Sequence, residues 1–110
     1  MSHEYIALPI DDENVTGLLT ISKSAVETIA ATAVLEVANV KLAEKTNFHN
    51  PVVCRIVDEV MRLSVEIRIG YNTNIADVCL AVQKKINQVL NQTIALTCEE
   101  IDVRVVGFVF

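Results

Sequence analysis

The sequence is poor in the residues that build many recognisable binding sites. It has no tryptophan, two tyrosines and three phenylalanines, and its aromatic content is 5%. Its only glycines are Gly17, Gly70 and Gly107, so no glycine-rich loop is present to hold a phosphate group. A surface that stacks nucleic-acid bases needs several aromatic side chains. These shortages argue against a P-loop enzyme and against an RNA-binding module.

Histidine and cysteine are also few, and their spacing does not form a metal motif. The two histidines are His3 and His49. His49 and Cys54 are the one histidine–cysteine pair close in sequence, and two ligands do not complete a zinc site. The other cysteines, Cys79 and Cys98, are far apart, so we expect three free thiols in a reducing compartment. The sequence predicts no metal site and no cofactor.

No nucleophile is placed beside a base either. Ser22 or Ser24 as a nucleophile would need one of the same two histidines, and capping of a helix is the simpler role for both serines. The acid pairs Asp58–Glu59 and Glu99–Glu100 are neighbours, and neighbours in a strand point to opposite faces. The sequence therefore predicts no catalytic residues and a protein that is not an enzyme.

Positive charge is scarce and unevenly placed. The chain has 9 Lys and Arg against 14 Asp and Glu, a net charge of −5. Four of these acids and no Lys or Arg lie in residues 1–14, so ten acids face nine bases from Val15 onward. Binding to nucleic acid needs clustered basic residues, so no nucleic-acid partner is expected. Residues 1–14 are expected to form a flexible acidic arm, either a solvated terminus or a docking segment.

Long apolar runs are absent although the chain is 52% hydrophobic. A bilayer-spanning helix needs about 18 or more consecutive apolar residues, so no direct membrane insertion is expected. Met1–Pro9 lacks the basic start and apolar run of a signal peptide. A chain of 110 residues is the size of one domain, which we place at residues 15–110.

The segment from Val60 to Gln92 carries the clearest structural signal. Apolar residues alternate with polar ones or glycine from Met61 to Gly70, which predicts a strand at Val60–Tyr71 with one buried face. The apolar period then changes to that of a helix, predicted at Asn74–Gln92 with Asn74 as the N-cap. A second helix is predicted at Ser24–Val37, where Ser24 and Glu27 have the spacing of a capping box, and Asn39 provides a left-handed stop.

The remaining strands complete a single α+β domain. They are predicted at Val15–Ile21, Val52–Val57 and Glu100–Phe110. The order is β-α-β-β-α-β, for which the simplest arrangement is a mostly antiparallel sheet with two helices packed on one face.

The last strand is apolar on both of its faces. Ile101, Val103 and Val105 supply the inward set. Alternation places a second apolar set on the outer face, and we predict an interface there made by Leu18, Val106, Phe108 and Phe110. Either another protein chain covers these residues, or the segment Tyr5–Ile10 folds back over them.

With these segments in place, the chain resembles the alkaline shock protein family, the Gls-type envelope stress response proteins of Gram-positive bacteria. The matching pieces keep the family's order and spacing: Gly17-Leu18-Leu19-Thr20-Ile21-Ser22, Val26-Glu27-Thr28-Ile29-Ala30, Glu36-Val37-Ala38-Asn39-Val40, Val65-Glu66-Ile67-Arg68-Ile69-Gly70-Tyr71 and Ile101-Asp102-Val103-Arg104-Val105-Val106-Gly107. Asn39 and Asn72 stand where the family usually has glycine, and asparagine tolerates positive φ.

The resemblance implies a non-enzymatic protein of the cytoplasm that supports cell-envelope homeostasis under stress. It implies self-association into a homo-oligomer and tethering to the inner face of the membrane by a membrane-anchored partner protein. The family pattern carries no catalytic residues to transfer. The alternative is a small-molecule-sensing regulatory module that acts through a subunit interface, which rests on analogy of fold alone.

Overall fold

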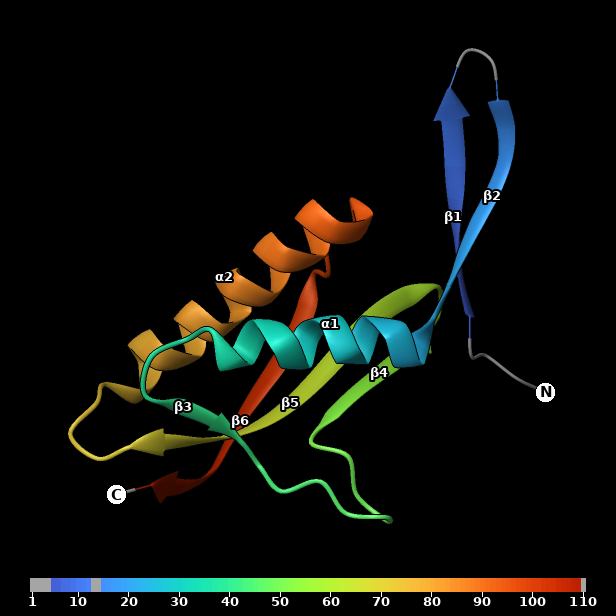
Figure 1. Ribbon diagram of the computed structural model, residues 1–110. Helices are drawn as coiled ribbons and strands as arrows, with labels where there is room; N and C mark the ends of the chain where they lie inside the picture. The colour runs from blue at the N-terminus through green and yellow to red at the C-terminus, as the bar shows by residue number, and fades with distance from the viewer. Residues whose placement is uncertain (1–4, 13–14, 110) are drawn as a thin grey trace.

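The computed structural model describes residues 5–12 and 15–109 of the chain (Figure 1). The fold is α+β, as predicted, with two helices and mostly antiparallel strands. The elements in chain order are β1 (Tyr5–Asp12), β2 (Val15–Ser22), α1 (Lys23–Leu35), β3 (Val40–Leu42), β4 (Val52–Val57), β5 (Val60–Gly70), α2 (Ile75–Ile94) and β6 (Glu100–Val109). The sequence patterns identified both helices and four of these strands, and missed β1 and β3.

Strand β5 is the centre of the main sheet. β6 runs parallel to it along one edge from Arg62 to Gly70. β3 and β4 pair antiparallel with β5 at Ile67–Ile69 and Val60–Val65, so they share the other edge, one after the other. The sheet is therefore three strands wide. Its parallel β5–β6 pair is possible because α2 carries the chain back across the sheet.

The segment between β3 and β4 is a loop whose two ends both hydrogen-bond to the backbone of Glu66 in β5. The backbone N–H of Ala43 donates to the carbonyl of Glu66, and the N–H of Glu66 donates to the carbonyl of Pro51. The side chains of His49, in the loop, and Glu66, in β5, also pair with each other. Phe48 lies near its tip and is 98% exposed.

The N-terminal strands form a separate two-stranded sheet. β1 pairs antiparallel with β2 from Tyr5↔Ser22 to Asp12↔Val15. In Figure 1 this hairpin projects from the body beyond the start of α1. Residues 5–12 of the predicted acidic arm thus form a strand, and we had not predicted this strand.

Several local features follow from turn chemistry. Asp58 and Glu59 both have positive φ, at 51° and 67°, and connect β4 to β5 as a two-residue hairpin loop. Asn39 has φ 63° after α1, which confirms the predicted left-handed stop. Asn72 has φ 66°, in the turn where glycine is usual in the family. Asparagine and aspartate tolerate this region better than most residues do.

The helix caps confirm one prediction and correct another. The Asn74 side chain accepts from the N–H of Asp77 at 3.1 Å, as predicted for the N-cap of α2. In α1 the cap is Ser22, whose Oγ accepts from Ala25 at 3.0 Å, so the predicted capping box of Ser24 and Glu27 is wrong. The Glu27 carboxylate instead accepts from the backbone N–H of Cys54 at 2.7 Å and so ties α1 to β4.

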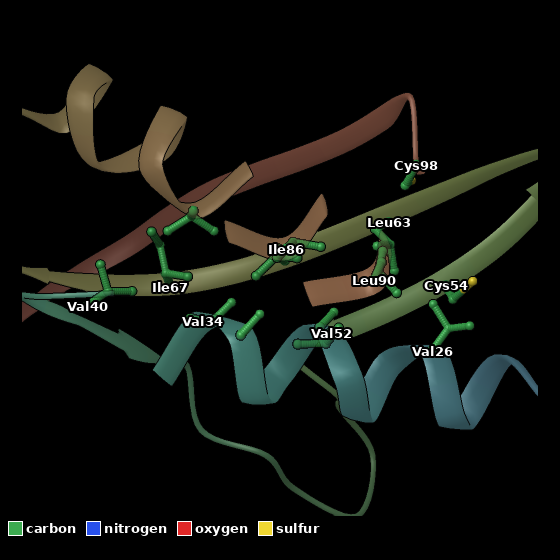
Figure 2. Close-up of a cluster of buried hydrophobic side chains, with 14 of the residues drawn as sticks. Val26, Val34, Val40, Val52, Cys54, Leu63, Ile67, Ile86, Leu90 and Cys98 are labelled. Carbon is green, nitrogen blue, oxygen red and sulfur yellow. The ribbon is translucent and has the colours of Figure 1, made fainter. Parts of the chain in front are cut away.

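The core fills the space between the two helices and one face of the sheet (Figure 2). Both helices contact each other, α1 lies over β3 and β4, and α2 lies over β6. The core side chains are the predicted apolar stripes: Val26, Ala30, Ala33 and Val34 of α1; Val82, Ile86 and Leu90 of α2; Leu63, Val65, Ile67 and Ile69 of β5. Leu63, Val65, Ile67 and Ile69 are each at most 1% exposed, whereas Met61, earlier in the same alternation, is only partly buried.

Two of the three free cysteines belong to this core. Cys98 is buried, and its backbone N–H and carbonyl are both bonded to the Asn87 side-chain amide, at 2.8 and 2.9 Å. Cys54 is 3% exposed in β4. Burial, with the negative charge of Glu27 nearby, raises the pKa of the Cys54 thiol to about 11.

We predict that alkaline pH destabilises the fold through Cys54. An unfolded thiol ionises near its ordinary pKa, whereas the folded thiol stays protonated to about 11. Between these values the folded state binds more protons, so the free energy of unfolding falls as pH rises. A two-unit difference corresponds to about 2–3 kcal/mol.

Urea unfolding at pH 8 and pH 10.5 measures this loss. Cys54→Ala should flatten the pH dependence, whereas Cys79→Ala, at a half-buried position, should change it less. An equal slope for Cys54→Ala and the unchanged protein would contradict the assignment.

Candidate functional site

Strand β6 contains a bulge that changes which face its last residues occupy. Ile67 of β5 pairs with Val105, but the next β5 residue, Arg68, pairs with Gly107. Val106 is therefore an extra residue in β6, without its own partner in β5. A Cβ added to Gly107 would lie 3.5 Å from the Arg68 Cγ, so Gly107 shares the outer face with that side chain.

The bulge corrects the predicted position of Phe108. Simple alternation places Phe108 on the outer face, away from the helices. In the structure Phe108 pairs with Ile69, which is fully buried on the helix side. Partners in adjacent strands share a face, so Phe108 lies on the helix side of the sheet. The prediction of the outer face for Phe108 is wrong because the extra residue shifts the alternation by one position.

Phe108 is nevertheless exposed, as the interface prediction required. It is 48% exposed, and Val106 is 52% exposed. The Phe108 ring stacks on the Tyr71 ring with centroids 5.4 Å apart and an angle of 17° between the planes. Tyr71 follows β5 directly and is itself 62% exposed. We call Tyr71, Val106 and Phe108 the apolar end of the sheet.

The other two residues of the predicted interface are placed differently. Leu18 lies in β2, opposite Pro9, and so belongs to the hairpin rather than to the main sheet. Phe110 lies outside the described residues. The hairpin and the end of β6 lie at opposite ends of the molecule in Figure 1. The segment Tyr5–Ile10 therefore does not fold back over Phe108.

The outer face of the sheet carries all four arginines of the chain. Arg55 lies on β4, Arg62 and Arg68 on β5, and Arg104 on β6, each at a position that alternates with buried or half-buried apolar residues. Arg62 pairs with Glu100 at 2.7 Å, and Arg104 pairs with Asp102 at 3.1 Å. We call this surface the arginine face. Arg62 and Glu100 thus form an ion pair between β5 and β6.

Two hollows open on the arginine face. One has a volume of about 460 Å³ and is lined mainly by charged side chains of β4, β5, β6 and the residues before β6. The other, of about 140 Å³, lies toward the loop that carries His49. Arg55, Ser64 and Arg104 line both hollows. Ser64 makes no hydrogen bond through its side chain to another residue in the described part of the chain.

The weak metal alternative finds no support in the geometry. His49 pairs with Glu66 on the outer face of the sheet, whereas Cys54 is buried under α1 on the other face. Among residues 5–12 and 15–109 no three His, Cys, Asp or Glu side chains gather as a metal site. No helix in the described ranges is long and apolar enough to cross a bilayer.

One sequence signal for the bulge was available. Gly107 interrupts a strand rich in valine and isoleucine, and an isolated glycine in a strand often marks a bulge. The Tyr71–Phe108 stack follows once the bulge is placed, because Phe108 then faces the same side as Ile69, two residues before Tyr71.

Comparison with known proteins agrees with the resemblance noted in the sequence. The chain has about the same fold as MamM-CTD, solved as a double variant, with a TM-score of 0.56 at 18% identity over 79% of this chain and 95% of that one. No curated protein matches. The sequence profile of the alkaline shock protein family, described as having a cell envelope-related function, matches residues 11–110. The chain therefore belongs to the alkaline shock protein family.

Proposed function

We propose that the protein is a non-enzymatic component of the cell-envelope stress response that works by binding other proteins. It self-associates and is held at the cytoplasmic face of the membrane by a membrane-anchored partner protein. Family membership supports a function related to the cell envelope. Self-association, tethering and the absence of catalysis are our inferences.

The observation that carries the proposal is the exposed apolar end. A tyrosine and a phenylalanine stacked in water leave much of both rings unburied, although burying one such side chain contributes about 1.5–3 kcal/mol. Aromatic side chains of this kind are enriched at protein interfaces. Within the described residues β6 pairs with β5 on one side only, so its other edge is also open to another chain.

The alternative of a small-molecule sensor finds less support. A ligand pocket is normally enclosed and lined mostly by apolar side chains. The hollow of about 460 Å³ has an adequate volume, but its lining includes Arg55, Arg62, Glu99, Glu100 and Asp102. These charged surface side chains suit contact with a polar macromolecule better than capture of a small apolar ligand.

We predict that replacing Phe108 and Phe110 with serine reduces self-association. The change removes the Phe108 ring, which is 48% exposed and lies outside the buried core. Size-exclusion chromatography with light scattering should show a smaller species than the unchanged protein, while circular dichroism shows the same helix content.

The matched control is Phe48→Ser, which removes an equally aromatic and more exposed side chain from the loop between β3 and β4. This control should keep the size of the unchanged protein. If the unchanged protein is already a monomer, self-association through the apolar end is wrong.

We predict that the same surface is needed to capture the membrane partner. Tagged protein used as bait on solubilised membranes should retain an integral membrane protein, and the Phe108→Ser, Phe110→Ser variant should retain several-fold less of it. Phe48→Ser should retain the normal amount. Recovery of no membrane protein by the unchanged bait would refute the tethering part of the proposal.

A further inference from the structure

The arginine face has a small side chain at its centre and long charged side chains around it. Ser64 lies in the middle strand β5, opposite Val53 of β4 and opposite Asp102 of β6. Both hollows of this face are lined by Ser64, Arg55 and Arg104. The two hollows therefore meet at Ser64, because its side chain is much shorter than those of the arginines beside it.

Most of the charged side chains around this point are paired with each other, but two arginines are not. The ion pairs on this face are Arg62 with Glu100, Arg104 with Asp102, and His49 with Glu66. Arg55 and Arg68 make no ion pair with other residues in ranges 5–12 and 15–109. Together with the Ser64 hydroxyl, these two guanidinium groups can bind groups from outside the chain.

The two unpaired arginines occupy positions where their charge weakens the sheet. Arg55 lies directly opposite Arg62, and Arg68 lies directly opposite Lys41. Like charges opposite one another in adjacent strands are destabilising. A surface that served only the fold would place opposite charges at these positions, so the two arginines indicate a face that binds an anionic partner.

The unpaired groups provide two positions for carboxylates. Arg55 and Ser64 both line the point where the hollows meet, and Arg68 lies four residues beyond Ser64 in β5. A guanidinium binds a carboxylate through charge-assisted hydrogen bonds, to which a hydroxyl can add another. Four residues of a strand span roughly 13 Å. Acidic side chains four positions apart in an extended chain have this spacing and point to the same side.

The mixture of charges on this face favours a protein partner over a lipid surface or a nucleic acid. Four acids line the same hollows: Glu66, Glu99, Glu100 and Asp102. They would repel a continuous layer of phosphate groups, whose binding needs basic residues clustered together. A protein segment with spaced carboxylates can instead contact the two unpaired arginines one at a time.

We propose that the arginine face binds an extended acidic segment of a partner protein. One carboxylate of the segment binds at Arg55 and Ser64, and a second, four residues away, binds at Arg68. The inference goes beyond the proposed function, because Phe108 of the apolar end lies on the helix side of the sheet and the arginine face lies on the other.

Fluorescence anisotropy with labelled synthetic peptides tests the contact. One dodecapeptide of threonine and serine carries glutamate at two positions four residues apart, and a second carries glutamine at the same two positions. At about 0.15 M salt the unchanged protein should bind the glutamate peptide about tenfold more tightly than the glutamine peptide. A third peptide with two adjacent glutamates should bind more weakly than the first, because it cannot reach both positions.

Charge reversal tests the residues. Arg55→Glu with Arg68→Glu should abolish the preference for the glutamate peptide. The new carboxylates lie opposite Arg62 and Lys41, so the melting temperature should equal or exceed that of the unchanged protein. The matched control, Lys45→Glu with Lys84→Glu, makes the same change in net charge at exposed positions outside the arginine face and should keep the preference.

Four results would overturn the proposal. They are equal binding of the glutamate and glutamine peptides, an equal loss of binding in the lysine control, an arginine variant that melts well below the unchanged protein, and binding to phosphatidylserine vesicles without binding to the glutamate peptide. The Phe108→Ser, Phe110→Ser variant should bind the glutamate peptide normally. Failure of this contact is therefore distinguishable from failure of the proposed function.

Discussion

The pairing of β5 on both edges is the constraint on which the rest of the molecule depends. Its inward side chains, Leu63 to Ile69, are at most 1% exposed and form the floor on which both helices pack. A shift of one residue in this strand would exchange that floor for Arg62, Glu66 and Arg68. The alternation of this one strand therefore fixes both faces of the sheet: one face packs in the core, and the other carries the charged side chains.

Strand β6 contributes to two different exposed surfaces of the sheet. Up to Val105 it follows the alternation of β5, with Asp102 and Arg104 on the charged face. The extra residue at Val106 then moves Phe108 to the helix side, against Tyr71. The bulge thus separates an aromatic end from the arginine face.

Most of the fold could be predicted from the sequence because its signals are local and repeated. The alternation of β5, the helical stripes of α1 and α2, and the caps at Asn74 and Asn39 each depend on neighbouring residues. β3 was missed because a strand of three residues has no period to recognise. β1 was missed because its acidic end resembles a solvated terminus in composition, whereas its partner β2 provides the pairing.

The candidate surfaces were harder to predict, since they depend on register between distant strands. Val106 and Phe108 were identified as exposed apolar residues, but their faces depend on a bulge defined only against β5. Glu27 was assigned to a helix cap because spacing along the chain cannot reveal its hydrogen bond to Cys54, which lies far away in the sequence, in β4. The clustering of four arginines from three strands is likewise a property of the assembled sheet.

The central claim is that the protein works through contacts made by the exposed apolar end of its sheet. Hydrogen exchange followed by mass spectrometry over a range of protein concentrations tests it most directly. The account predicts that peptides from Glu100–Val109 exchange more slowly as the concentration rises, while peptides from α2 keep a constant rate. Identical exchange of all these peptides at every concentration, and also with membrane partner added, would contradict it.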